Sequence, residues 1–174
     1  AVRELAPEAG KRYLDIGCGT GDVMIELLRQ SQSARVTGLD PAEKMLDEAK
    51  PKLERLSLSD QTDLVHADAC DLPFEESVFS GMISAFCFRN IADRRQALRE
   101  ALRALLPGGK LVLLELTVTE VPWLAPFYKL HSRCVIPLIG RLMGNRQAYQ
   151  YLSDSIIDFS LKTDVVTMMT EAGF

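Results

Sequence analysis

The sequence of 174 residues contains only two histidines, and its four cysteines stand apart, without a Cys-x-x-Cys pair. Neither pattern provides the closely spaced ligands of a zinc site, so we expect no metal. Scattered thiols are typical of proteins in a reducing compartment. Apolar runs of membrane-spanning length are lacking too, and no signal peptide is recognised. Together these absences favour a cytoplasmic protein.

An excess of basic residues is also lacking, because 24 acidic residues outnumber 20 lysines and arginines and leave a net charge of −4. That balance argues against nucleic acid as the main partner. The sequence has no internal repeats and no low-complexity linkers. With 47% hydrophobic residues, a chain of this length can bury a substantial core. We therefore expect a single domain over residues 1–174.

What the sequence does contain is a glycine-rich segment near its start, Asp15-Ile16-Gly17-Cys18-Gly19-Thr20-Gly21-Asp22. It follows a strand-like run and precedes an amphipathic helical pattern. Glycines at alternate positions let a strand turn sharply into a helix, and they leave no side chain between the backbone and a ligand. Asp15 places a carboxylate at the strand tip, where it can hold an ammonium group. The segment predicts a cofactor site at Asp15, Gly17 and Gly19.

Two alternatives to this interpretation are a dinucleotide site and a purely structural turn. In the pyrophosphate fingerprint Gly-x-Gly-x-x-Gly, the third glycine falls where Asp22 stands. Asp22 is expected to cap the helix, and its charge would repel a pyrophosphate. S-adenosylmethionine carries a sulfonium and an ammonium and no phosphate, so it fits this segment better than NAD does.

Apolar runs alternate with helical patterns along the chain. Strands are predicted at 12–16, 35–40, 62–66, 81–85 and 110–116. Helices are predicted at 22–30, 42–57 and 94–105, with a kink at Pro51 and a turn at Pro107-Gly108-Gly109. This alternation predicts an α/β fold of the Rossmann-like type, with a mostly parallel sheet and helices on both faces.

Ligands of such sheets bind beyond the carboxyl ends of the strands. The second predicted strand ends at Asp40, where an acid can accept both ribose hydroxyls. The third is followed by Asp68 and Ala69, placed to meet the amino group and ring edge of an adenine. Helix capping is the alternative role for any one acid at a strand end. Acids at three strand ends around a glycine turn favour a nucleoside site.

These motifs resemble those of class I S-adenosylmethionine-dependent methyltransferases. Within that fold the chain resembles the UbiE/COQ5 family, which methylates a ring carbon of quinols in ubiquinone and menaquinone biosynthesis. The similarity to the class lies in the glycine segment, Asp40-Pro41, and Asp68-Ala69 with Leu72-Pro73-Phe74. The similarity to the family lies in Phe86-x-x-Arg89-Asn90-x-x-Asp93, Pro107-Gly108-Gly109-x-Leu111, Leu114-Glu115, Ile136-Pro137-x-Ile139-Gly140 and Tyr149-x-Tyr151-Leu152.

The resemblance implies that Thr20, Asp40, Asp68 and Ala69 contact S-adenosylmethionine, and that the catalytic residues Arg89 and Asn90 face a prenylated quinol. A quinol carbon attacks well only when its ring hydroxyl loses a proton, and a cation beside that oxygen lowers the hydroxyl pKa. We expect Arg89 to supply that cation and Asn90 to orient the oxygen. The alternative is that Arg89 pairs with Asp93 or another acid and holds the loop. The general base is left unassigned among Tyr128, His131, Tyr149 and Asp154.

Residues 118–160 are expected to form a helical lid over the substrate. Its stretch from 121 to 153 contains basic, aromatic and aliphatic residues and no acid. That composition suits contact with anionic headgroups, and an ordinary helical cap over the sheet is the alternative. We expect a peripheral position at the inner membrane, and a homodimer or a quinone-biosynthesis complex as the assembly.

The chain departs from the family pattern at Ser80, Ala85, Cys87 and Thr117. Those departures keep two alternatives open: a methyltransferase for another small-molecule or lipid acceptor, and a non-catalytic scaffold subunit that binds S-adenosylmethionine. In the family, a segment covering the active site precedes the part matched here, and a strand hairpin follows Phe174. We therefore expect the sheet to be cut short before its last strands.

Overall fold

The structure is a computed structural model that describes residues 1–117, 151, 154–156, 158–159 and 164–174. It divides into two compact units, Ala1–Glu115 with Val166–Phe174, and Leu116–Val165. Most of the lid predicted at 118–160 lies outside the described residues. The lid residues that the structure does describe are helical, at 151, 154–156 and 158–159. The prediction of one domain with a helical lid therefore stays a prediction.

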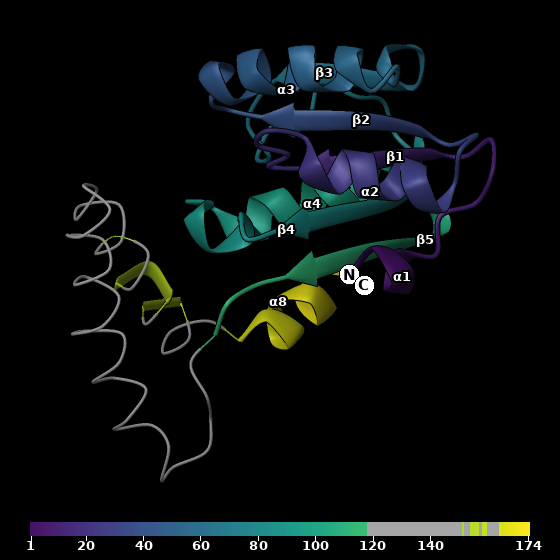
Figure 1. Ribbon diagram of the computed structural model, residues 1–174. Helices are drawn as coiled ribbons and strands as arrows, with labels where there is room; N and C mark the ends of the chain where they lie inside the picture. Colours follow the sequence, from purple (N-terminus) through teal and green to yellow (C-terminus); the bar gives the residue numbers. More distant parts are fainter. Residues whose placement is uncertain (118–150, 152–153, 157, 160–163) are drawn as a thin grey trace, which may run out of the picture. The chain divides into compact units, whose positions relative to one another are not determined.

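The first unit contains a sheet of five parallel strands (Figure 1). The strands are β1 (Arg12–Ile16), β2 (Arg35–Asp40), β3 (Thr62–His66), β4 (Phe79–Ala85) and β5 (Leu105–Leu114). Their order is β3-β2-β1-β4-β5, so the direction of winding reverses between β1 and β4. In open sheets of this kind, ligands bind beyond the carboxyl ends of the strands at such a reversal.

The bounds of β1, β2 and β3 confirm the prediction, and β4 begins two residues earlier than 81. The expected turn at residues 107–109 is corrected, because this segment lies inside β5. Phe79 pairs with Leu105 and Gly81 with Lys110, so three extra residues of β5 are accommodated as an irregularity in the ladder. Gly108 allows this with a φ of +78°, a conformation that glycine adopts without steric cost.

Helices cover both faces of the sheet, with α2 in front of it and α4 behind it in Figure 1. The helices are α1 (Val2–Leu5), α2 (Asp22–Gln30), α3 (Glu43–Arg55), α4 (Arg94–Ala104) and α8 (Val165–Ala172), with 3-10 helices η1 (Ser59–Gln61) and η2 (Phe88–Asn90). Pro51 lies inside α3. Helices α1 and α8 and both 3-10 helices were not predicted; α1 and the 3-10 helices, at three or four residues, are too short to show periodicity.

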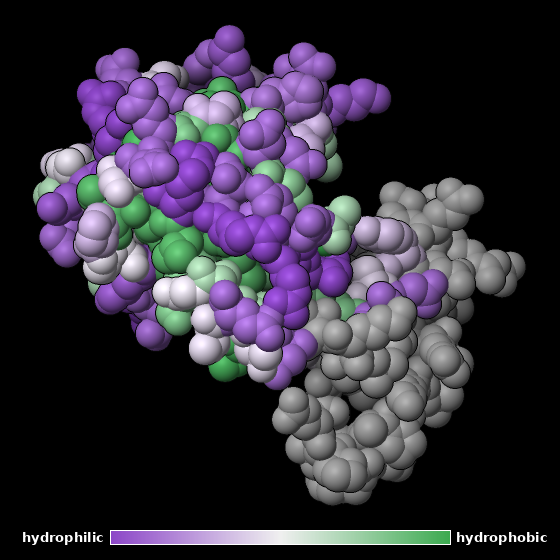
Figure 2. All heavy atoms as spheres, turned by 180° about the vertical axis from the view of Figure 1, so that it is seen from behind, coloured by the Kyte–Doolittle hydropathy of each residue, from purple (hydrophilic) through white to green (hydrophobic). Residues whose placement is uncertain are grey.

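Two apolar clusters fill the faces of the sheet. Tyr13 belongs to the cluster formed with α1, α2 and α3, whereas Leu14 and Ile16 belong to the cluster formed with α4. Because side chains of a strand alternate between faces, Asp15 points to the same side as Tyr13. The outer surface on the α4 side is mainly hydrophilic (Figure 2). Within the described part of the chain, no helix combines the length and apolar character needed to cross a membrane.

Candidate active site

The glycine turn follows β1 at the reversal of the sheet. Gly17, Gly19 and Gly21 have φ values of +73°, +53° and +81°, which side chains with a Cβ rarely adopt. A Cβ on Gly17 would lie 2.1 Å from the Cys87 Sγ, whereas one on Gly19 would meet no atom of the described residues within 4 Å. The turn is therefore packed on one side and bare at Gly19.

Asp40, the last residue of β2, shapes this turn. Its Oδ2 accepts a hydrogen bond from the Gly19 N–H at 2.8 Å, and its Oδ1 accepts one from the Ala42 N–H at 2.8 Å. Each carboxylate oxygen has a second lone pair, so Asp40 can bind a ribose as well. The predicted contact with a ribose stays a prediction, and the structure adds that Asp40 holds the turn in place.

Asp15 lies beneath the turn and is almost fully buried, with 1% of its surface exposed. Its neighbours in the ladder are Gly38 on β2 and Ile83 on β4. Among the residues that the structure describes, the Asp15 Oδ2 has no hydrogen-bond partner. Burial, and secondarily the charge of Asp40, raises the pKa of Asp15 from 3.8 to about 8. A buried carboxyl without a partner is costly, and a cationic ligand would relieve that cost.

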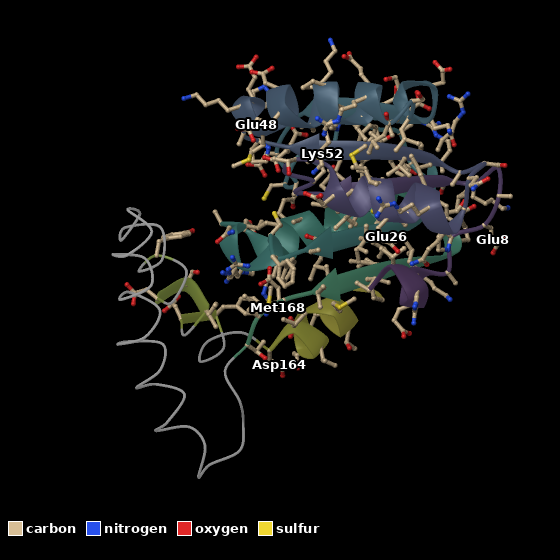
Figure 3. The ribbon with its side chains drawn as sticks, viewed as in Figure 1. Glu8, Glu26, Glu48, Lys52, Asp164 and Met168 are labelled. Carbon is tan, nitrogen blue, oxygen red and sulfur yellow. The ribbon has the colours of Figure 1, made fainter. Side chains whose placement is uncertain are left out.

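The predicted capping by Asp22 is wrong, because Gly21 is the N-cap of α2 and Asp22 is the first residue of that helix. Asp22 is instead held by Lys52 of α3, whose Nζ lies 2.6 Å from the Asp22 Oδ1; Figure 3 labels Lys52. The Thr20 hydroxyl donates to the Asp22 Oδ2 at 3.0 Å. The hydrogen bond from Lys52 lowers the pKa of Asp22. Its negative charge therefore lies at the start of α2 and is balanced locally.

The pair Asp68-Ala69 lies just beyond the end of β3. Asp68 is exposed, and its Oδ1 accepts from the Cys70 N–H at 2.8 Å. Ala69 is buried in the apolar cluster that faces α4. The pair thus occupies a strand end, as predicted, and its contact with an adenine is untested.

Arg89 and Asn90 lie in η2, after the end of β4. The Arg89 Nη1 lies 2.9 Å from the Glu115 Oε2, and the two side chains are only 8% and 7% exposed. The Arg89 N–H also donates to the Glu115 Oε1 at 3.2 Å. Arg89 is therefore paired with an acid, but the acid is Glu115. Asp93 instead caps α4 through the Gln96 N–H.

Three features of the site were not predicted. Lys52 balances Asp22, Cys87 packs against Gly17, and Phe86 has a φ of +60°. No pattern in the sequence predicts that the backbone of a phenylalanine adopts the left-handed conformation. Of the four candidates for the general base, Tyr128, His131 and Tyr149 lie outside the described residues, and Asp154 belongs to the second unit. Among the described residues, no cluster of potential metal ligands is present.

A bare turn, a buried carboxyl without a partner and a second acid at the next strand end fit a cationic nucleoside better than a phosphate-bearing one. Together with the parallel sheet, they are the features expected of a Rossmann-like methyltransferase. Comparison with known proteins agrees with this class. The sequence matches the ubiE/COQ5 methyltransferase family over residues 2–174. The chain belongs to that family.

Its relatives include ubiquinone/menaquinone biosynthesis C-methyltransferases. The one from Roseobacter denitrificans is 39% identical over 171 residues, which cover 98% of this chain and 68% of that protein. The one from Syntrophotalea carbinolica is 39% identical over 174 residues, covering 100% of this chain and 73% of that protein.

Among solved structures, a SAM-dependent methyltransferase from Aquifex aeolicus has a TM-score of 0.61 at 21% identity, over 70% of this chain and 64% of that one. At this identity the likeness shows the fold alone. The predictions of the family, of the fold class and of an S-adenosylmethionine-dependent enzyme are confirmed.

Proposed function

We propose that this methyltransferase methylates a ring carbon of a prenylated benzoquinol or naphthoquinol in ubiquinone or menaquinone biosynthesis. The observation that carries the proposal is the similarity over nearly the whole chain to enzymes named for this reaction. The site supports it, because buried carboxyls and a bare backbone turn suit the cofactor of that reaction.

S-adenosylmethionine, when bound, supplies an electrophilic methyl group. Asp15, whose Oδ2 has no partner among the described residues, would ionise when the cofactor binds and neutralise its ammonium group. Asp40 binds the ribose with its remaining lone pairs. The backbone of Gly17, Gly19 and Thr20 would lie against the cofactor, and Asp68 and Ala69 would contact its adenine at the end of β3. These residues orient the cofactor and exclude water from it.

Arg89 and Asn90 face the acceptor in this proposal. Arg89 is paired with Glu115. The negative charge of Glu115 therefore weakens the attraction between Arg89 and an oxygen of the acceptor. The effect of Arg89 on the hydroxyl pKa is therefore smaller than that of an unpaired guanidinium. Arg89 also fixes the loop after β4, and Asn90 orients the ring oxygen.

The acceptor's prenyl tail must come from a membrane, and this supports a peripheral membrane contact. Residues 121–153, which carry Lys129, Arg133, Arg141 and Arg146, form the proposed contact. A homodimer or a quinone-biosynthesis complex is the proposed assembly.

The test is a transfer assay with isotope-labelled S-adenosylmethionine and a mixture of demethylated quinols, beside a panel of phenols, amines and lipids. We expect the label on a ring carbon of one quinol. Transfer only to another acceptor would contradict the proposed substrate. If nothing is methylated although calorimetry shows that the cofactor binds, the protein is a scaffold subunit. Preferential binding of NAD in the same titration would overturn the cofactor assignment.

A further inference from the structure

Phe86 combines two properties that are costly for an aromatic residue. Its backbone lies in the left-handed region, with a φ of +60°, where a bulky side chain is a genuine outlier. Its side chain is also 47% exposed. The other non-glycine residues described with positive φ are Ala6, Ser57 and Ser77, all of them small. Core packing does not explain the strain, because the ring is not in the core.

The surrounding contacts hold this conformation. The Phe86 N–H donates to the Leu114 carbonyl at 2.8 Å, and the Phe86 carbonyl accepts from the Arg89 Nη1 at 2.5 Å. The same Nη1 is fixed by the buried carboxylate of Glu115. Strained backbone persists only where its surroundings over-determine it, and such residues cluster at ligand sites. The ion pair thus works as a clamp on Phe86.

The position of Phe86 in the fold indicates why the Arg89–Glu115 pair holds this residue in a fixed conformation. Phe86 directly follows β4, next to β1 at the reversal of the sheet, and its neighbour Cys87 packs against Gly17 of the cofactor turn. Phe86 therefore lies at the carboxyl edge of the sheet, where ligands of this fold bind. A half-exposed aromatic ring at that edge suits a planar, apolar ligand rather than a charged one.

We propose that Phe86 is a binding residue for the acceptor, and that its ring forms an aromatic wall against which the planar acceptor ring packs. Offset or edge-to-face contact with the Phe86 ring orients that plane. The Arg89–Glu115 pair acts through Phe86 as a positioning device. The inference rests on the proposed function, because it assumes an aromatic acceptor.

The test uses Phe86→Gly, since glycine tolerates this φ and the substitution removes the benzyl side chain. We expect the KM for a short-chain demethylated quinol to rise about tenfold, while the Kd for S-adenosylmethionine changes less than about twofold. The denaturation midpoint should stay equal or rise, because strain is removed. Ser57→Gly is the matched control: it relieves the same backbone conformation after α3 and should leave the KM unchanged.

Equilibrium binding of the corresponding quinone, measured by calorimetry for the parent and for Phe86→Gly, gives a readout independent of turnover. Equal affinities and equal KM values would overturn the inference while leaving the proposed function intact. A weaker cofactor Kd with an unchanged KM would place the ring against the cofactor and would overturn it as well. A parent protein that neither binds nor methylates any quinol would instead refute the proposed function.

Discussion

Burial makes ionisation of the Asp15 carboxyl unfavourable in the folded state, and the stability of the fold therefore depends on pH. The pKa of Asp15 rises from 3.8 to about 8, first through burial and then through Asp40. Below pH 3.8 the folded and unfolded states are both protonated. As the pH rises, Asp15 ionises first in the unfolded state. The contribution of Asp15 to the free energy of unfolding is therefore lost progressively up to about pH 8.

We expect Asp15→Asn to flatten this dependence. The free energy of unfolding of the parent should fall between about pH 5 and about pH 8 relative to that of the variant, as measured by urea denaturation. Asp60→Asn, which changes an exposed carboxyl on η1, is the control and should follow the parent. Parallel profiles for the parent and Asp15→Asn would show that the pKa of Asp15 is the same in the folded and unfolded states.

Arg89 and Glu115 form a buried pair, and removing one partner leaves the other charge uncompensated. Arg89→Ala is expected to destabilise the fold by about 3–5 kcal/mol. The double variant Arg89→Ala/Glu115→Ala should be more stable than the single one, because no lone charge stays buried. If Arg89 also serves the reaction, the double variant should bind the cofactor but turn over slowly. Equal stability of both variants would argue against the pair as a mutually dependent unit.

Residues at strand ends could be predicted because topology alone places them. The topology rule assigns Asp15 and Asp40 to one edge of the sheet, and both are found there. The partner of Arg89 could not be predicted, because Glu115 is 26 residues away and its approach depends on how β4 and β5 align. The strained Phe86 has no sequence signature, since its conformation is set by contacts that no local pattern records.

At the scale of elements, the glycine turn is the feature that decides whether a nucleoside can bind. Gly19 has a φ of +53°, and a Cβ added to it would meet no atom within 4 Å in the part of the chain that the structure describes. Gly19→Ala therefore costs only backbone strain, roughly 1–2 kcal/mol. We expect the affinity for S-adenosylmethionine, measured by calorimetry, to fall at least about tenfold, because the new methyl group lies between backbone and ligand.

Gly10→Ala is the matched control for this variant. Gly10 precedes β1 and has a φ of +74°, and a Cβ added to it would likewise meet no described atom within 4 Å. Its loss of stability should resemble that of Gly19→Ala, with the cofactor affinity unchanged. An unchanged affinity in both variants would mean that the ligand does not cover Gly19.

Elements with short apolar runs between turn residues could be predicted well. Strands β1 to β3 and helix α2 have the expected bounds, because burial on the sheet faces agrees with local propensity. β5 was mispredicted, since Pro107-Gly108-Gly109 has turn chemistry and yet lies within the strand. A parallel ladder can absorb three extra residues, and sequence alone does not reveal where it does so.

For the whole molecule, charge is distributed unevenly along the chain. The net charge is −4, yet residues 121–153 contain four basic residues and no acidic one. We expect the combined change of Arg133, Arg141 and Arg146 to Glu to abolish sedimentation with anionic vesicles, since such binding depends on basic residues near the surface. The affinity for S-adenosylmethionine should not change.

A control with the same change in net charge separates local contact from overall charge. Lys44, Lys50 and Arg55 are exposed on α3, and changing all three to Glu should leave vesicle binding close to that of the parent. If both triple variants lose binding equally, the net charge alone governs it. If neither does, the proposed membrane contact is refuted.

The clustered acids of the site have one more chemical effect. Burial and the neighbouring carboxyls raise the pKa of both nearby thiols, that of Cys87 to about 11 and that of Cys18 further still. A thiolate is the form of cysteine that reacts with electrophiles, and a sulfonium is an alkylating agent. The carboxyls that favour binding of a sulfonium thus also keep the thiols of Cys18 and Cys87 protonated and unreactive. Prolonged incubation with S-adenosylmethionine should leave the mass of the protein unchanged, because the protonated thiols are not methylated.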